Sequence, residues 1–160
     1  MPRMWNEIIL SAPELHDQYI LVESSVLAVI CAYRQDSREK HEAGGTLMGY
    51  RSGKHLHVLH ATVPMPLDKS SRISFERLDP GHQRAVTKAW EVSRGRIDYL
   101  GDWHTHPQVN PSPSGTDYTE WAKLGSTLKK SLFFVIVGEH SKLFAAYHVD
   151  HRTIPLTASR

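Results

Sequence analysis

The sequence predicts an α/β protein in which a mixed β-sheet is sandwiched between helices. Two observations lead to this prediction. Short apolar runs bounded by turn residues alternate with longer segments whose apolar side chains recur at helical spacing. The chain has 160 residues, which suits one domain and is long enough to bury a core. We therefore expect a single domain over residues 1–160.

In the first half of the chain, apolar runs and turn residues predict five strands, a helix and a loop. A helix is expected from Ser24 to Gln35, a turn at 51–53 and a loop at 64–71. The expected strands are EIIL at 7–10, YILV at 19–22, TLMGY at 46–50, KHLHVLHATV at 54–63 and RISFERL at 72–78. The third and fourth strands flank the turn and should form a hairpin.

The second half continues the alternation. Pro80 and Gly81 lead into a helix that ends near Gly95, and the strand IDYLGDWHTH at 97–106 follows directly. A second helix is expected from Ser114, with basic residues near its negative C-terminal end. The apolar runs LFFVIVG at 132–138 and KLFAAYHV at 142–149 complete the predicted sheet.

Charge and cysteine content exclude several classes of protein. The net charge of +2 is too balanced to favour nucleic acid or an anionic membrane as an obligatory partner. The one cysteine, Cys31, excludes an internal disulfide and a multi-cysteine zinc cluster. The N-terminus lacks the apolar core of a signal peptide, and no apolar stretch approaches about 18 residues. We therefore expect a cytoplasmic protein.

The segment GDWHTHPQVNPSPSGTD at 101–117 predicts a metal site. His104 and His106 share one face of a strand, so both imidazoles can reach one ion at about 2.0–2.1 Å. Ser114 and Asp117 have the Ser-x-x-Asp spacing of a helix start, which would turn the carboxylate back toward the histidines. Three protein ligands leave one position for water, and this open position distinguishes a catalytic zinc from a structural one.

Each part of this segment also has a simpler interpretation. Ser114 and Asp117 alone are typical of a capping box, and a His-x-His pair is often a polar strand face. A second pair, His55 and His57, has no serine or carboxylate at comparable spacing, and we interpret it as a solvated face. The longer spacing and its context therefore carry the prediction.

Hydrolysis of an amide also needs a base and a group that protonates the leaving amine. Glu42 is a candidate for both because it precedes the glycine-rich segment 44–49, where the backbone can approach a partner closely. On the residues alone, the favoured interpretation of Glu42 is an incidental surface residue between a helix and a strand.

Two segments together resemble the JAMM signature of MPN-domain zinc metallopeptidases. They are HEAGGTLMG at 41–49 and, much later, WHTHPQVNPSPSGTD at 103–117. Every fixed position of that signature is present. The resemblance implies the MPN fold, a three-layer arrangement similar to that of deaminases. It also implies that His104, His106 and Asp117 bind Zn²⁺, that Glu42 is the general base and acid acting on the zinc-bound water, and that Ser114 stabilises the oxyanion.

Three further segments resemble the compact bacterial branch of this family: SFERLDPGHQ, YLGDWHTHP and YTEW. This branch includes the deconjugating peptidases of CBASS antiphage systems. The resemblance implies cleavage of the amide that links the C-terminus of a cGAS-like nucleotidyltransferase, or of a ubiquitin-like modifier, to target proteins. Such an enzyme would reverse conjugation by an E1-E2-like ligase.

Phe75, Arg77 and the loop at 64–74 correspond in position to the segment that clamps an extended substrate tail in this family. A strand edge there could pair with the tail by β-augmentation. Core packing for Phe75 and a solvated face for Arg77 stay open alternatives. Trp103 is expected in the core, and Asp102, on the histidine face, either orients a ligand or is exposed.

Three other functions share features with this sequence. A zinc nucleobase deaminase needs a Pro-Cys-x-x-Cys pair, which a chain with one cysteine excludes. A RadC-like protein of DNA metabolism shares the JAMM segment, but this chain shows no separate helical DNA-binding module. A non-catalytic MPN scaffold would have lost its metal, and the intact set of candidate ligands argues against it. Bound zinc tests the scaffold alternative.

Overall fold

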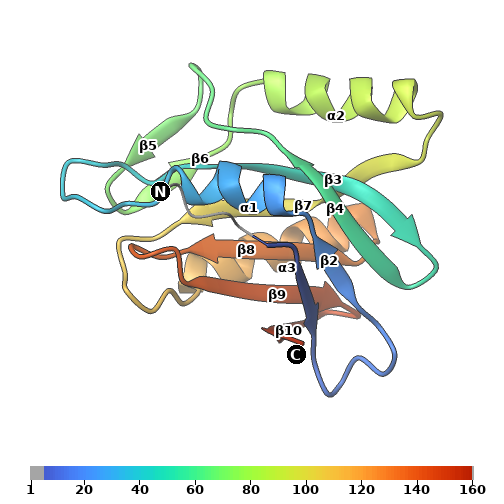
Figure 1. Cartoon of the computed structure of the whole chain (residues 1–160). Helices are drawn as coiled ribbons and strands as arrows, with labels where there is room; N and C mark the ends of the chain where they lie inside the picture. The colour runs from blue at the N-terminus through green and yellow to red at the C-terminus, as the bar shows by residue number, and fades with distance from the viewer. Residues whose placement is uncertain (1–5, 160) are drawn as a thin grey trace.

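A mixed sheet forms the centre of the molecule and closes on itself as a barrel in the order β1-β10-β9-β8-β7-β3-β4-β2 (Figure 1). The computed structural model describes residues 6–159. The strands of the barrel are β1 (Ile8–Ser11), β2 (Ile20–Val22), β3 (Gly44–Ser52), β4 (His55–Ala61), β7 (Ile97–Thr105), β8 (Leu132–Val137), β9 (Leu143–Val149) and β10 (Arg152–Ala158). The β2–β4 and β7–β8 pairs are parallel and the other pairs antiparallel, so the predicted mixed sheet is confirmed.

The closure of the sheet differs from the predicted sandwich. Strand β10 pairs with both β9 and β1 and thereby joins the two ends of the sheet. The sequence did not predict β10, because Pro155 lacks a backbone donor and the exposed residues of this strand interrupt the apolar pattern. The sheet therefore curls into a barrel, where the sequence indicated a mixed sheet sandwiched between helices.

In residues 6–159, three helices pack around this sheet (Figure 1): α1 (Ser24–Cys31), α2 (Gly81–Val92) and α3 (Gly115–Leu128). Helix α1 ends earlier than the predicted Gln35. After Cys31 the chain tightens into turns, in which the Tyr33 amide donates to the Ile30 carbonyl and the Arg34 guanidinium donates to the Cys31 carbonyl. None of the helices in the described part of the chain is long and apolar enough to cross a membrane.

The apolar run of β8 is buried on both of its faces, which fixes where α1 and α3 lie. Phe133, Val135 and Val137 join the cluster that contains the buried side of α1. Phe134 and its alternating neighbours join a second cluster with Trp121 of α3, whose ring stacks on Phe134 at 4.7 Å. A continuous apolar strand is expected when both faces of a sheet are covered. This packing brings the N-terminus of α3 to the end of β7.

Strand β7 turns alternate side chains to opposite faces. Trp103 is 1% exposed and its indole N–H donates to the carbonyl of Thr62, while Thr105 is fully buried. Both point away from the face that carries His104, as strand periodicity predicts. The expected core position of Trp103 is confirmed.

The predicted loop at 64–71 contains a strand, β5 (Lys69–Ser71), which forms a hairpin with β6 (Ser74–Glu76). Buried Asp68 holds this region together. Its carboxylate accepts hydrogen bonds from the amides of Met65, Leu78 and Asp79, and it lies 2.7 Å from the buried His82 imidazole of α2. The segments on either side of the hairpin are therefore joined to each other and to α2 by polar contacts inside the fold.

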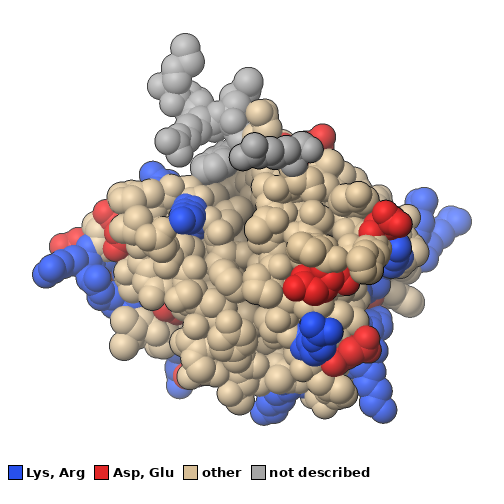
Figure 2. Space-filling model, turned by 90° about the horizontal axis from the view of Figure 1, so that it is seen from below, with Lys and Arg blue, Asp and Glu red and all other residues tan. Residues whose placement is uncertain are grey.

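The face shown in Figure 2 carries its charged side chains mainly near the margins, with uncharged residues across most of its centre. No broad patch of one sign covers this face, in agreement with the net charge of +2. A nucleic-acid-binding surface gathers Lys and Arg on one face or groove. The face in Figure 2 lacks that feature.

Candidate metal centre

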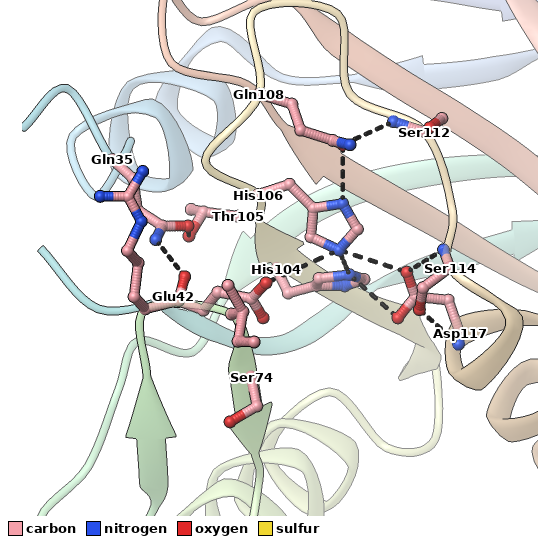
Figure 3. A network of polar contacts seen from close by, with 12 residues as sticks. Gln35, Glu42, Ser74, His104, Thr105, His106, Gln108, Ser112, Ser114 and Asp117 are labelled. Atoms are coloured by element: carbon pink, nitrogen blue, oxygen red, sulfur yellow. Dashed lines mark hydrogen bonds and ion pairs between the residues drawn. The ribbon is translucent and has the colours of Figure 1, made fainter. Parts of the chain in front are cut away.

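Three side chains from two elements converge at the end of β7 (Figure 3). His104 lies near the end of this strand, His106 directly follows its last residue, and Asp117 lies in the first turn of α3. Within the described residues, these three form the one group of His, Cys, Asp or Glu side chains whose ligand atoms could hold a metal, all within 4.8 Å of one another. The structure thus brings together the three predicted ligands.

The spacing of the donor atoms fits zinc. The two histidine Nε2 atoms are 3.0 Å apart, and they lie 3.2 Å and 3.3 Å from the nearer carboxylate oxygens of Asp117. Ligands about 2.0–2.1 Å from a tetrahedral ion are separated by about 3.3–3.4 Å. Two imidazole nitrogens so close to each other cannot both carry a proton directed at the other. A cation between them removes this conflict.

Gln108 sets the orientation of His106, and the sequence did not identify it. The side-chain oxygen of Gln108 accepts from the Ser112 amide at 3.1 Å and lies 3.1 Å from His106 Nδ1. Because this oxygen can only accept, Nδ1 carries the proton and donates. Nε2 is then left with a lone pair directed at His104 and Asp117, as a metal ligand requires. The signal available in the sequence was a glutamine two residues after His106.

The capping box that the sequence predicts at the start of α3 is confirmed. The Ser114 hydroxyl accepts from the Asp117 amide at 3.1 Å, and the Asp117 carboxylate accepts from the Ser114 amide at 2.9 Å. Burial would raise the pKa of Asp117, but the contacts with His104 and His106, together with the hydrogen bond from the Ser114 amide, hold that pKa well below its usual range. The carboxylate therefore stays an anion, as a metal ligand must.

Glu42 lies beside this group, in the segment that leads into β3. Its side chain is 6% exposed, and Oε1 is 3.8 Å from His106 Nε2. Burial raises the pKa of Glu42 from an ordinary 4.5 to about 7; His106 opposes this rise, and the negative charge of Asp117 adds to it. A carboxyl group that is half protonated near neutral pH can both accept and donate a proton.

Phe75, in β6, lies over the start of β3. A Cβ atom added to Gly44 would sit 2.7 Å from the Phe75 ring and 2.7 Å from the Trp103 carbonyl. Gly44 pairs with His104 across the β3–β7 ladder. The absence of a side chain at Gly44 therefore lets the half-buried Phe75 ring approach the strand that borders the candidate metal centre.

Arg77 and Asp102 form an internal ion pair. Their closest atoms are 3.3 Å apart, and the Arg77 guanidinium lies 5.9 Å from the centre of the Tyr99 ring. The side chain of Asp102 is 20% exposed, so it is not the solvated strand residue that the sequence left open. Arg77 is 29% exposed and keeps part of its surface in contact with solvent.

The second histidine pair lies elsewhere on the barrel. His57 Nε2 is 2.6 Å from the Glu23 carboxylate, and His55 Nδ1 accepts from the Tyr19 amide. Neither histidine belongs to the group of candidate metal ligands found in the described residues. The second pair therefore lies apart from the candidate metal ligands, as its sequence context indicated, but both of its imidazoles are partly buried and hydrogen-bonded, where the sequence indicated a solvated face.

Comparison with known proteins identifies the family. The model for "Prokaryotic homologs of the JAB domain" matches residues 24–152. The chain belongs to this family. The resemblance to JAMM metallopeptidases that the two sequence segments indicated is thereby confirmed, and a JAB domain that keeps a His-His-Asp cluster implies a bound metal.

Several curated relatives resemble this JAB domain over most of its length. A "CD-NTase/cGAS isopeptidase" of Pseudomonas aeruginosa is 42% identical over 73% of this chain and 75% of its own. A protein of the same name from Vibrio cholerae is 33% identical over 84% of this chain and 86% of its own. A "Probable metalloprotease y4qB" of Sinorhizobium fredii is 36% identical over 56% of this chain and 57% of its own. These names support a hydrolase.

A solved structure supports the fold of this JAB domain. The solution structure of protein DSY2949 from Desulfitobacterium hafniense covers 86% of this chain and 88% of its own, with a TM-score of 0.58 and 22% sequence identity. At this identity, the likeness concerns the fold alone.

Proposed function

We propose that this JAB domain is a zinc-dependent isopeptidase of a bacterial CBASS antiphage system. It hydrolyses the amide that joins the C-terminus of a cGAS-like nucleotidyltransferase, or of a ubiquitin-like modifier, to a target protein, and so reverses an E1-E2-like conjugation in the cytoplasm. The observation that carries this proposal is the convergence of His104, His106 and Asp117 beside the buried carboxyl group of Glu42. The names of the relatives support the class of substrate.

The donor set suits zinc chemically as well as geometrically. Two imidazoles and one carboxylate make a set of ligands typical of catalytic zinc, which keeps a further position open. Zinc held there supplies a Lewis acid that polarises a carbonyl and lowers the pKa of water to about 7. Gln108 keeps the Nε2 lone pair of His106 available for this role.

Glu42 performs the proton transfers in the proposed mechanism. Its carboxylate takes a proton from the attacking water and, as the acid, gives that proton to the nitrogen of the leaving amine. A single group can serve both steps because the proton that it takes from water is the one that it later donates, and burial raises its pKa to about 7, nearer to neutrality than that of an ordinary carboxyl group. Its position 3.8 Å from His106 puts it next to the candidate metal position.

Ser114 stabilises the negative oxygen that forms as water adds to the amide carbonyl. Its hydroxyl oxygen accepts from the Asp117 amide, so the hydroxyl hydrogen is available to a substrate oxygen. Such a donor typically contributes about 10² to 10³ in rate. The capping contact fixes the hydroxyl at the start of α3 and therefore serves both roles.

Phe75 and Arg77 contact the extended C-terminal tail of the conjugated protein in this proposal. The Phe75 ring lies over Gly44, whose strand partner is His104, so a tail that passes along β6 would reach the centre. Asp102 and Tyr99 fix the Arg77 guanidinium while part of it stays exposed.

The proposal is tested with cGAS-like nucleotidyltransferase and ubiquitin, each joined through its C-terminal carboxyl group to the side chain of a fluorescent lysine peptide. The zinc-loaded wild type should release the peptide from at least one of these conjugates, and Glu42→Gln should keep its zinc and lose cleavage. Glu23→Gln is a matched control, because Glu23 also contacts a histidine, His57, away from the centre. Cleavage by Glu42→Gln at the wild-type rate would reject the proposed base.

A further inference from the structure

One buried amide joins three segments that border the candidate metal centre (Figure 3). Gln35, just after α1, is 2% exposed. Its amide nitrogen donates to the carbonyl oxygens of Arg72 at 2.8 Å and Lys40 at 3.2 Å, and its oxygen accepts from the Thr105 hydroxyl at 2.8 Å. A single side chain thus connects the segment before β3, the turn of the β5–β6 hairpin and the end of β7.

These contacts continue directly to the backbone around Glu42. The Thr105 hydroxyl accepts from the Ala43 amide at 3.0 Å, and the Thr105 amide donates to the Ala43 carbonyl at 2.9 Å. On the other side, the Glu42 amide donates to the Ser71 carbonyl at 2.8 Å, one residue before the turn that Gln35 holds. The backbone of Glu42 is therefore held on one side by Thr105, which Gln35 contacts, and on the other by Ser71, which precedes Arg72, the other contact of Gln35.

Thr105 lies between the two histidines in sequence, and it points to the opposite face of β7. A shift of Thr105 relative to Ala43 would change the distance between the Glu42 carboxyl group and both imidazoles. Gln35 opposes such a shift because its amide nitrogen donates to the Lys40 and Arg72 carbonyls while its oxygen accepts from Thr105. Neither a carboxylate nor an apolar side chain of equal length can form this set of contacts.

We infer that Gln35 is a positioning residue, which sets the place of Glu42 relative to His104 and His106 and couples it to the hairpin that carries Phe75. Gln35 touches no reacting atom in this account. The inference rests on the proposed function for its effect on catalysis, while its effect on the backbone stands independently. A misplacement of about 1 Å can reduce a rate by about 10²-fold.

The test is Gln35→Met, which keeps the length of the side chain and removes its polar groups. With the conjugate that wild type cleaves, kcat should fall by about ten- to a hundredfold, while KM and zinc content stay at wild-type values. In the absence of substrate, hydrogen exchange in residues 40–46 should be faster than in wild type, with exchange in β8 unchanged. Gln18→Met is the matched control, because Gln18 is also a buried glutamine and its amide nitrogen has no partner among the described residues.

A second pair of variants keeps the inference testable if Gln35→Met does not fold. Thr105→Val removes the acceptor of the Ala43 amide and should reproduce the loss of kcat, whereas Thr105→Ser should retain the wild-type rate. Wild-type exchange in residues 40–46 of Gln35→Met, or an equal loss of kcat in Gln18→Met, would overturn the inference. If wild type cleaves none of the conjugates while exchange in Gln35→Met still rises, the proposed function fails and the positioning role stands.

Discussion

Replacement of Ser114 separates its two proposed roles, which act on different measurable quantities. In Ser114→Ala, the Asp117 amide loses its acceptor, whereas the Asp117 carboxylate still accepts from the backbone amide at position 114. Loss of an N-cap side chain costs about 1 kcal/mol, which lowers the Tm of a chain of this size by about 2–4 °C. The protein stays folded, because natural domains are stable by about 5–15 kcal/mol.

Turnover should respond much more strongly than stability. Removal of the hydroxyl donor should lower kcat by about 10² to 10³, equivalent to about 2.7–4 kcal/mol of transition-state stabilisation, while the protein keeps its zinc. Ser114→Gly refines the comparison, because glycine at an N-cap costs only a few tenths of a kcal/mol and also lacks the hydroxyl. Steady-state kinetics, metal analysis and thermal unfolding of both variants provide the three readouts. Near-normal kcat in Ser114→Gly would refute the oxyanion role.

Three further predictions concern the surroundings of the centre. Gln108→Leu removes the acceptor of the His106 Nδ1 proton and should weaken zinc affinity by about 10- to 100-fold, measured by competition with a chelator; unchanged affinity would contradict the assigned orientation. Gly44→Ala places a Cβ atom 2.7 Å from the Phe75 ring and the Trp103 carbonyl and should reduce the free energy of unfolding by about 1–3 kcal/mol. Gly53→Ala is the control for conformational strain alone, because Gly53 has a positive φ and no atom lies within 4 Å of the added Cβ. Burial would raise the pKa of Asp68, but hydrogen bonds from the Asp79 amide, His82 and the Met65 amide hold that pKa below the ordinary 3.8. The stability that Asp68 provides should therefore be present above about pH 4 and be lost as the pH falls through the lower pKa of the folded protein. Denaturant titrations of Asp68→Asn should lack this part of the acid dependence.

The three candidate metal ligands could be predicted from the sequence because each depends on local geometry. Alternation along β7 puts His104 and the following His106 on one side, and the capping box at the start of α3 directs the Asp117 carboxylate back toward them. Glu42 could not be placed in this way. It reaches the centre through the β3–β7 ladder, in which Gly44 pairs with His104. The register between distant strands is a property of the whole sheet, and the family resemblance supplied what local patterns lacked.

The parts that the sequence missed depend on contacts between distant residues. Strand β10 has a proline and several exposed residues, so it forms through pairing with β1 and β9 and lacks a strong pattern of its own. Gln35 is a polar residue after a helix, and no pattern in the neighbouring sequence indicates that its amide connects Thr105, Lys40 and Arg72. Side-chain hydrogen bonds of this kind become visible only when the segments they join are placed in space.

The most direct test of the central claim is the rate of amide cleavage measured as a function of the zinc bound per chain. Metal-free protein is reloaded in steps, and both quantities are determined on the same samples with the C-terminal lysine-peptide conjugates. The rate should rise in proportion to bound zinc and reach its maximum at about one ion per chain, as three ligands from one centre require. A cleavage rate that is independent of bound metal would refute the proposed zinc dependence.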